Sequence, residues 1–423
     1  MRQRWFLVSK KLKFTSYFMQ TLCQNFKIKH QAIDSIRKEL VGLLEEIERN
    51  DSSEVRNRAE NLLATLEDNL AKLREEFAGH FSLFGVLLYP ERTAERLERL
   101  KQTSLWDEEK GLWIGGVDEY GDEMDDNCYT KDQLLYLHLL IALGEEGEAK
   151  VQLERLKQTN LWDARKEQWV RCINENGFRE DTARYIQDQF VYLRLLVSLD
   201  EDNEAEAFFT KLKQTNFWDE ETGLCVHRLL EDGGRGYNYF SDDQLLHLRL
   251  LIALGEKEEA QAKFVSFKQT RLWNKKDRLW TFSMNKVDSE NPTGYYIDDQ
   301  LAHLHLMVAL GKDDDARRHI ARLKKTKFWN ERNGLWIKVM GKRGGLHDTT
   351  HYAAHQLSYL YLLAALGEKD EARAYLEKLK QTNLWDKETG QWIESIREDG
   401  SEKSTNRNTC DQLLGALVEG LVE

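Results

Sequence analysis

Proline is almost absent from this sequence, with two residues in 423, and no stretch is apolar for long enough to span a bilayer. The apolar part of the N-terminus, Trp5 to Val8, is too short for a secretory signal. The five cysteines form no CxxC pair, and so few, widely spaced thiols predict a reducing, cytoplasmic location. With 32% of residues charged, these absences favour long helices with solvated outer faces.

Acidic residues are missing from the first 30 positions, which carry seven Lys or Arg. Since the whole chain has a net charge of −12, the remaining 393 residues carry −19. So acidic a body argues against nucleic-acid binding, because phosphate contacts need a basic surface. It favours either a protein partner that presents a basic surface or helix, or simply solubility.

A repeated stretch organises the rest of the chain. Lys-Gln-Thr-Asn-Leu-Trp-Asp is intact at Lys157–Asp163 and Lys380–Asp386, and related stretches occur four more times. Successive copies of its tryptophan are 55 or 56 residues apart, at Trp106, Trp162, Trp218, Trp273, Trp329 and Trp385. A glutamine that opens an apolar run keeps nearly the same step, at Gln133, Gln189, Gln244, Gln300, Gln356 and Gln412. A fixed period of this size predicts one supersecondary unit, copied and stacked.

Each copy predicts an outer amphipathic helix, a short Trp-containing hairpin, a variable loop and an inner apolar helix. The last apolar helix, 411–422, ends the protein without a polar cap, so an open solenoid would leave it exposed. We therefore expect an all-α, closed (α/α)6 toroid over 89–423, with an open superhelix as the alternative. Helical spacing of apolar residues predicts a helical hairpin at 27–88, and 1–26 is expected to be a basic arm. The long loops all emerge beside the starts of the inner helices, which predicts the functional face.

The pattern resembles that of the α/α-toroid superfamilies. Gly111-Leu-Trp113 and Gly390-Gln-Trp392 are similar to the Gly-x-Trp ending of terpenoid cyclase and protein prenyltransferase repeats. The order of motifs in 106–133 resembles repeats of the six-hairpin sugar enzymes, including the N-acylglucosamine 2-epimerase type. The acidic stretch Asp122–Asp126 differs from the Asp-x-Asp-Asp motif of the cyclases. The resemblance implies the fold and an enzyme cavity at its centre.

The glutamine that opens each inner helix shares one side of it with the residue three positions later. If this side faces the interior of the ring, it predicts a polar and aromatic ligand cup. The predicted ligand-binding residues are Gln133, Tyr136, Gln189, Tyr192, Gln244, His247, Gln300, His303, Gln356 and Tyr359. A structural interpretation stays open, in which the glutamines tie the loops to the helix starts, because every copy has one.

Repeat five departs from the other copies. His355 replaces the Asp before its glutamine, and His347 and His351 precede it at a spacing of four. On a helix this spacing gathers imidazoles on one face, so the three histidines are the candidates for a metal site. His351 and His355 are also candidates for acid–base catalysis. The two glycines before His347 favour a loop instead, and we expect neither a metal nor a cofactor.

The loop of repeat one is rich in carboxylates. Asp125 and Asp126 are the further catalytic candidates, because paired carboxylates serve acid–base chemistry. A run of acidic residues is also typical of a solvated or partner-facing surface.

The copies remain similar even where the inner helices begin, whereas an enzyme's repeats normally diverge around its active site. We therefore expect a non-catalytic scaffolding or regulatory protein that binds its partner through the acidic, loop-bearing face. The alternative is a carbohydrate-active enzyme of isomerase or hydrolase type, or an isoprenoid-type enzyme, with its active site at the mouth of the toroid. A small-molecule ligand inside the ring is compatible with both.

Overall fold

The computed structural model describes residues 90–236, 238–285, 294–341 and 345–422. The basic arm predicted at 1–26 and the helical hairpin predicted at 27–88 lie outside these residues. The boundary at residue 89 stays a prediction.

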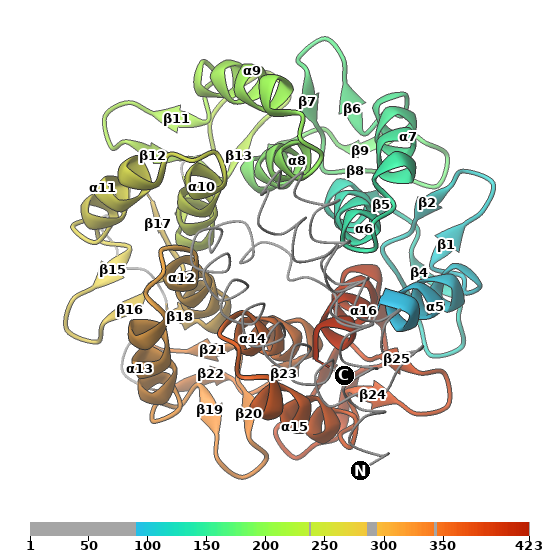
Figure 1. The fold of residues 1–423 in the computed structure, drawn as a ribbon, viewed down its shortest axis with the longest axis vertical. Coiled ribbons are helices and arrows are strands. Elements are labelled where there is room, and N and C mark those ends of the chain that lie inside the picture. Colours follow the sequence, from blue (N-terminus) through green and yellow to red (C-terminus); the bar gives the residue numbers. More distant parts are fainter. Residues whose placement is uncertain (1–89, 237, 286–293, 342–344, 423) are drawn as a thin grey trace, which may run out of the picture. The chain divides into compact units, whose positions relative to one another are not determined.

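Inner and outer helices alternate along the described residues, and the inner helices surround a central axis (Figure 1). The inner helices are α6 (Thr130–Ala142), α8 (Ile186–Ser198), α10 (Ser241–Ala253), α12 (Ile297–Ala309), α14 (Ala353–Ala365) and α16 (Thr409–Val422). The outer helices are α5 (Pro90–Lys101), α7 (Glu146–Lys157), α9 (Asp202–Lys213), α11 (Lys257–Phe267), α13 (Asp313–Leu323) and α15 (Lys369–Leu379). The inner helices are buried on most sides, as their nearly continuous apolar sequences require.

A two-stranded antiparallel hairpin follows each outer helix and corresponds to the repeated Trp stretch. In repeat one, Gly111 has a φ of 66° at the turn, a conformation that glycine adopts without steric cost. The hairpins are β1 (Trp106–Asp107) with β2 (Leu112–Trp113), β6 (Trp162–Asp163) with β7 (Gln168–Trp169), β11 (Trp218–Asp219) with β12 (Leu224–Cys225), β15 (Trp273–Asn274) with β16 (Leu279–Trp280), β19 (Trp329–Asn330) with β20 (Leu335–Trp336), and β24 (Trp385–Asp386) with β25 (Gln391–Trp392). The second strand of five hairpins ends in a fully buried tryptophan, and buried Cys225 takes this place in the third.

A second set of strands joins each repeat to the next. The strand before each inner helix pairs with a strand of the following repeat, and in four repeats a third strand extends the sheet. These sheets are β5 (Cys128–Tyr129) with β8 (Cys172–Ile173) and β9 (Arg179–Asp181); β10 (Arg184–Tyr185) with β13 (Arg228–Leu229); β14 (Asn238–Phe240) with β17 (Ser283–Asn285); β18 (Tyr295–Tyr296) with β21 (Val339–Met340) and β22 (Leu346–Asp348); β23 (His351–Tyr352) with β26 (Ser395–Ile396) and β27 (Glu402–Ser404); and β28 (Arg407–Asn408) with β3 (Gly116–Val117) and β4 (Glu123–Asp125).

The last repeat pairs with the first. Strand β28 of repeat six lies against β3 of repeat one, and the backbone N–H of Thr409 donates to the carbonyl of Gly115. Helix α16 packs against both α5 and α6, and Arg96 forms a 2.9 Å ion pair with Glu419 across this contact. These contacts bury the apolar face of α16. The closed toroid is therefore confirmed, and the open superhelix is wrong.

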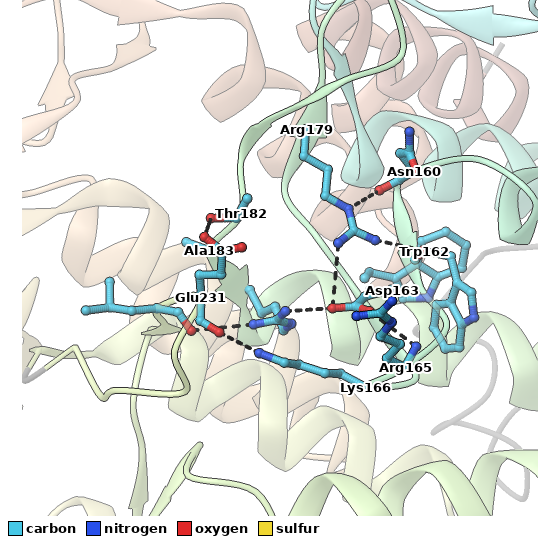
Figure 2. A network of polar contacts seen from close by, with 12 residues as sticks. Asn160, Trp162, Asp163, Arg165, Lys166, Arg179, Thr182, Ala183 and Glu231 are labelled. Atoms are coloured by element: carbon cyan, nitrogen blue, oxygen red, sulfur yellow. Dashed lines mark hydrogen bonds and ion pairs between the residues drawn. The ribbon is translucent and has the colours of Figure 1, made fainter.

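In repeats two and six, a polar lock fixes the Trp hairpin to the strand before the inner helix. In repeat two, Arg184 lies 2.8 Å from a carboxylate oxygen of Asp163, which directly follows the marker tryptophan. Figure 2 shows the network around Asp163, in which the Arg179 guanidinium also donates to the Asn160 carbonyl. Arg407 and Asp386 form the same lock in repeat six, 2.7 Å apart. The residue five positions before the glutamine therefore has a structural role in these two repeats.

Candidate active site at the mouth of the ring

The inner helices begin together at one end of the ring, which we call the mouth. A half-buried residue precedes each of them, and it is aromatic in five of the six repeats. These residues are Tyr129, Tyr185, Phe240, Tyr296, Tyr352 and, in repeat six, Asn408. The first N–H of each inner helix donates to a carbonyl of the next repeat, so the pairing of neighbouring repeats shapes the mouth.

The glutamines predicted to form a ligand cup are buried and bonded to their own hairpins. In repeat one, Gln133 accepts a hydrogen bond from the backbone N–H of Trp113 at 3.0 Å and donates to its carbonyl at 2.7 Å. The same two bonds recur in the other copies, from Gln189, Gln244, Gln300 and Gln356. This geometry supports the interpretation that the glutamines are structural. Each amide satisfies backbone groups of the hairpin that would otherwise be buried without partners.

The residues three positions after these glutamines are also buried. Tyr192 donates to Glu204 on the outer helix, and His303 packs against both tryptophans of its hairpin. Tyr136, His247 and Tyr359 lie equally deep. The helix face that we assigned to the interior is therefore turned toward the hairpins and outer helices. Periodicity fixes which residues share a face, but not where that face points.

The residue two positions before each glutamine faces the mouth instead. Only two of the six repeats have the same residue here, whereas the buried positions beside it are nearly constant. These residues are Lys131, Gln187, Asp242, Asp298, Ala354 and Cys410. Lys131, Gln187 and Cys410 line a cavity of about 390 Å³ between the starts of α6, α8 and α16. Its other lining residues are Gly115, Asp125, Tyr129, Asp132, Arg171, Tyr185, Asp188, His227 and Asn408.

His227 forms one of two histidine–carboxylate pairs at the mouth. Its Nδ1 lies 2.8 Å from a carboxylate oxygen of Asp243, which is fully buried at the start of α10. The imidazole packs between the rings of Tyr185 and Phe240, at 5.0 and 4.3 Å between centroids. Burial opposes protonation, but the hydrogen bond and charge of Asp243 outweigh it and raise the pKa of His227. His227 also lines the cavity, which makes it a candidate proton donor.

His355 forms the second pair. Its Nε2 lies 3.0 Å from a carboxylate oxygen of Asp298, at the start of the neighbouring helix α12. Burial would raise the pKa of Asp298, but the charge and hydrogen bond of His355 hold it below its usual value. Among the described residues, Nδ1 of His355 has no hydrogen-bond partner. This nitrogen is buried, and with Nε2–H donated to Asp298 it is the ring atom left for proton exchange.

The other histidines of repeat five do not join His355. His351 is buried, and its ring nitrogens bond to the Trp336 carbonyl and the Asn333 amide. It occupies the position of the hairpin lock, where repeat two has Arg184. His347 lies in strand β22 rather than on a helix, so the helical spacing does not apply to it. In the described part of the chain, no three potential ligands gather to hold a metal ion.

Of the acidic residues predicted from loop one, Asp125 reaches the cavity. It accepts a 2.9 Å hydrogen bond from the Tyr129 hydroxyl. Asp126 is half-buried beside it and does not line the cavity. Three carboxyls that directly precede the repeated glutamines lie deeper: burial raises the pKa of Asp132, Asp188 and Asp411 to about 7. Such groups exchange protons near neutral pH.

One position at the mouth was missed by the sequence analysis. The residue two places after the second hairpin aromatic accepts a backbone hydrogen bond from the preceding repeat's inner helix. It is different in every copy: Gly115, Arg171, His227, Phe282, Lys338 and Glu394. The flanking Trp and loop positions are far more regular, so this divergence was visible in the sequence. An asymmetric ligand needs such unlike contacts.

Comparisons with known proteins identify the fold. No protein-family model and no curated protein sequence matches this chain. Among solved structures, D-mannose isomerase is similar with a TM-score of 0.61 at 13% identity, over 79% of this chain and 96% of that one. Cellobiose 2-epimerase of Bacillus thermoamylovorans gives 0.59 at 14% identity, over 77% and 98%. An α-1,6-mannanase of Salegentibacter gives 0.52 at 13% identity, over 78% and 98%.

These similarities correct our prediction of a non-catalytic scaffolding or regulatory protein. The proteins that share the fold are epimerases, isomerases and glycoside hydrolases, which agrees with the carbohydrate-active alternative. The regularity on which we based the prediction belongs to the buried Gln and Trp positions, whereas the mouth differs between repeats. A protein partner on the acidic face has no support.

The helices of the described residues are all too short or too polar to cross a membrane. Cytoplasmic location stays a prediction. The described part of the chain has the six-hairpin α/α-toroid fold that these sugar-isomerising and sugar-hydrolysing proteins share.

Proposed function

We propose that this protein is a carbohydrate-active enzyme of the isomerase or epimerase type, with its active site at the mouth of the ring. The observation that carries the proposal is the presence of two histidine–carboxylate pairs, His227–Asp243 and His355–Asp298, on α10, α12 and α14 and the bend just before β13. Sugar isomerases and epimerases of this kind need one group that removes a proton beside a carbonyl and one that returns a proton.

The two histidines are suited to different parts of this chemistry. His227 has a raised pKa and an Nδ1 held by Asp243, so its Nε2 can deliver a proton to a sugar oxygen or carbon. His355 is the candidate for removing a proton, because the carboxylate of Asp298 stabilises the imidazolium that would form. The carboxylates also fix the orientation of the two imidazole rings, which holds each reacting nitrogen in position for proton transfer.

The walls of the mouth suit a sugar. The half-buried aromatic rings before the inner helices offer faces for stacking against the apolar side of a pyranose. The Arg171 guanidinium lies 4.7 Å from the Tyr185 ring and donates to its hydroxyl at 2.9 Å, which holds both groups at the cavity wall. The cavity of about 390 Å³ falls within the range of small-molecule sites.

A glycoside hydrolase is the second candidate, on a separate observation. Asp132 and Asp188 line the same cavity from adjacent helices, and burial raises the pKa of both to about 7. One protonated and one ionised carboxyl is the arrangement that glycosidic cleavage uses.

The test is a screen of reducing sugars for isomerisation and of oligosaccharides for hydrolysis. Wild-type protein is compared with His227→Gln, His355→Gln and the paired-carboxyl variant Asp132→Asn. His351→Gln is the matched control, because His351 is a neighbouring buried histidine that serves the hairpin lock. The proposal expects isomerisation that falls about 100-fold or more in the first two variants and persists in the control. Hydrolysis lost only in Asp132→Asn would favour the second candidate, and no turnover of any sugar would overturn both.

A further inference from the structure

The charged groups exposed at the cavity of the mouth are mainly cationic. Lys131 and Arg171 line the cavity and are exposed, whereas Asp132 and Asp188, which also line it, are each only 6% exposed. Burial raises the pKa of both carboxyls to about 7, so at neutral pH each is protonated for part of the time. The cavity therefore presents two exposed positive charges beside buried carboxyls that are only partly ionised.

Asp125 is the third carboxylate at the cavity, and its oxygens are already bonded within their own loop. One oxygen accepts a hydrogen bond from the side-chain amide of Asn127 at 2.9 Å, and the other accepts from the Tyr129 hydroxyl at 2.9 Å. These bonds hold the carboxylate in the cavity wall and leave the ammonium of Lys131 unpaired.

Lys131 occupies a position where a lysine does not stabilise the fold. It is the second residue of α6, and a cation in the first turn is repelled by the positive end of the helix dipole. None of the other five repeats has a basic residue at this position, so the repeat does not require one. Among the described residues, none forms an ion pair or a hydrogen bond with the Lys131 ammonium. A role in binding explains the lysine better than a role in folding.

Arg171 is fixed in the cavity wall but keeps donors for a ligand. Its Nη1 donates to the Tyr185 hydroxyl at 2.9 Å and lies 3.9 Å from a carboxylate oxygen of Asp181. The guanidinium also packs over the rings of Tyr185 and Tyr129, at 4.7 and 5.8 Å from their centroids. In the described chain, Nη2 and Nε of Arg171 have no hydrogen-bond partner. The fork is thus pre-oriented, and two of its nitrogens remain available.

The helices around the cavity add to its positive potential. Helices α16, α6 and α8 pack side by side in this order, and the cavity lies between their starts (Figure 1). The positive ends of three helix dipoles therefore point toward the cavity, where they favour a negatively charged ligand.

We propose that the sugar substrate carries an anionic group, a carboxylate or a phosphate, which Lys131 and Arg171 bind at the mouth. This inference rests on the proposed function, because it assigns the anion to the sugar on which the histidines act. The guanidinium matches two oxygens of such a group, and the ammonium adds a point charge. His227 lines the same cavity, so one bound sugar can contact both the cations and the proton donor.

A purely internal role for Lys131 makes a different prediction. Burial raises the pKa of Asp132 and Asp188, and the charge of Lys131 opposes this effect. If that were its whole function, removing the charge would weaken the binding of neutral and anionic sugars equally.

The test compares two non-reducing sugars by calorimetry with the full-length protein. Methyl glucuronide has a carboxylate where methyl glucoside has a hydroxymethyl group, and neither has a free carbonyl that could be isomerised. Binding is therefore measured separately from catalysis. Wild type is compared with Lys131→Met and with Lys131→Arg, which keeps the charge. The matched control is Lys257→Met, which removes the same charge from an exposed position on the outer helix α11.

Wild type should bind the glucuronide at least about tenfold more tightly than the glucoside, because hydrogen bonds to charged groups are the stronger ones. Lys131→Met should abolish this preference and leave the affinity for the glucoside within about twofold, whereas Lys131→Arg and Lys257→Met keep the preference. Glucose 6-phosphate in the same assay identifies the anionic group as a phosphate if it binds more tightly than the glucuronide.

Two results would overturn the inference: no preference of wild type for either anionic sugar, or an equal loss of affinity for both glycosides in Lys131→Met. The two proposals fail separately. A preference for the anionic sugars without turnover of any sugar would overturn the proposed function, whereas turnover of neutral sugars without the preference would overturn only this inference.

Discussion

Nε2 of His355 lies 3.0 Å from the carboxylate of Asp298, which comes from the neighbouring inner helix and stands 57 residues earlier in the chain. The partners meet only because consecutive repeats place the starts of α12 and α14 side by side. Replacing Asp298 by Asn keeps an acceptor for Nε2–H but removes the negative charge. We expect kcat on the sugar substrate to fall about 10- to 100-fold with little change in KM, since the charge supports the protonated imidazole and not substrate binding. A change confined to KM would contradict this role.

The second histidine pair predicts a pH dependence. Because Asp243 raises the pKa of His227, the replacement Asp243→Asn should lower that pKa, which an NMR titration of the His227 ring measures directly. A histidine whose pKa is raised by folding adds stability below its unfolded value of about 6.5, and this stability is lost as pH rises through the folded value. The difference in unfolding free energy between wild type and the variant should therefore be larger at pH 6 than at pH 9. A difference independent of pH would show that the pair is not coupled.

The buried glutamines predict a loss of stability rather than a loss of binding. Gln300 accepts from the Trp280 N–H at 3.0 Å and donates to the carbonyls of Trp280 and Tyr296 at 2.8 and 3.0 Å. Gln300→Leu leaves these backbone groups buried without partners, which should cost about 2–4 kcal/mol in urea unfolding. The control Gln261→Leu changes an exposed position on α11 and should stay within about 0.5 kcal/mol. If Gln300→Leu unfolds like wild type but no longer binds sugar, the ligand-cup interpretation is restored.

The ring and its hairpins could be predicted because the sequence pattern that encodes each unit is repeated along the chain. Six copies of the Trp stretch fix the unit, and the strongly apolar helix 411–422 needs neighbours that bury it, which the first repeat supplies. The face of the inner helices could not be predicted, because spacing relates Gln133 to Tyr136 without saying which neighbour they face. Only the hydrogen bonds of Gln133 to Trp113 show that this side belongs to the hairpin.

The mouth was harder to predict for a different reason. His355 stood out because it departs from the repeat, but its partner Asp298 looks like an ordinary acidic residue at a helix start. His227 and Arg171 lie in loops, and they join the site because strands of neighbouring repeats pair and bring them beside Tyr185. Such contacts depend on how the strands of consecutive repeats pair, and they leave no local pattern in the sequence.

Three positions after the glutamine, five repeats have a tyrosine or a histidine, but repeat six has Gly415. The structure explains this difference. A Cβ at Gly415 would overlap the indole of Trp392. Gly415→Ala should therefore destabilise the protein by about 1–3 kcal/mol through overpacking, as measured by urea unfolding. Gly147→Ala on α7 meets no atom within 4 Å and should be neutral or add up to about 1 kcal/mol. Equal effects of the two variants would mean that α16 does not pack as described.

The central claim is that the mouth transfers protons to and from a sugar. Its most direct test is to incubate each reducing sugar with the protein in deuterated water and to follow the hydrogen beside the carbonyl by NMR. The account predicts deuterium at that carbon with wild type, and a rate about 100-fold or more lower with His355→Gln, while His351→Gln exchanges like wild type after correction for its folded fraction. Exchange that is unaffected by His355→Gln, or absent from every sugar tested, would contradict it.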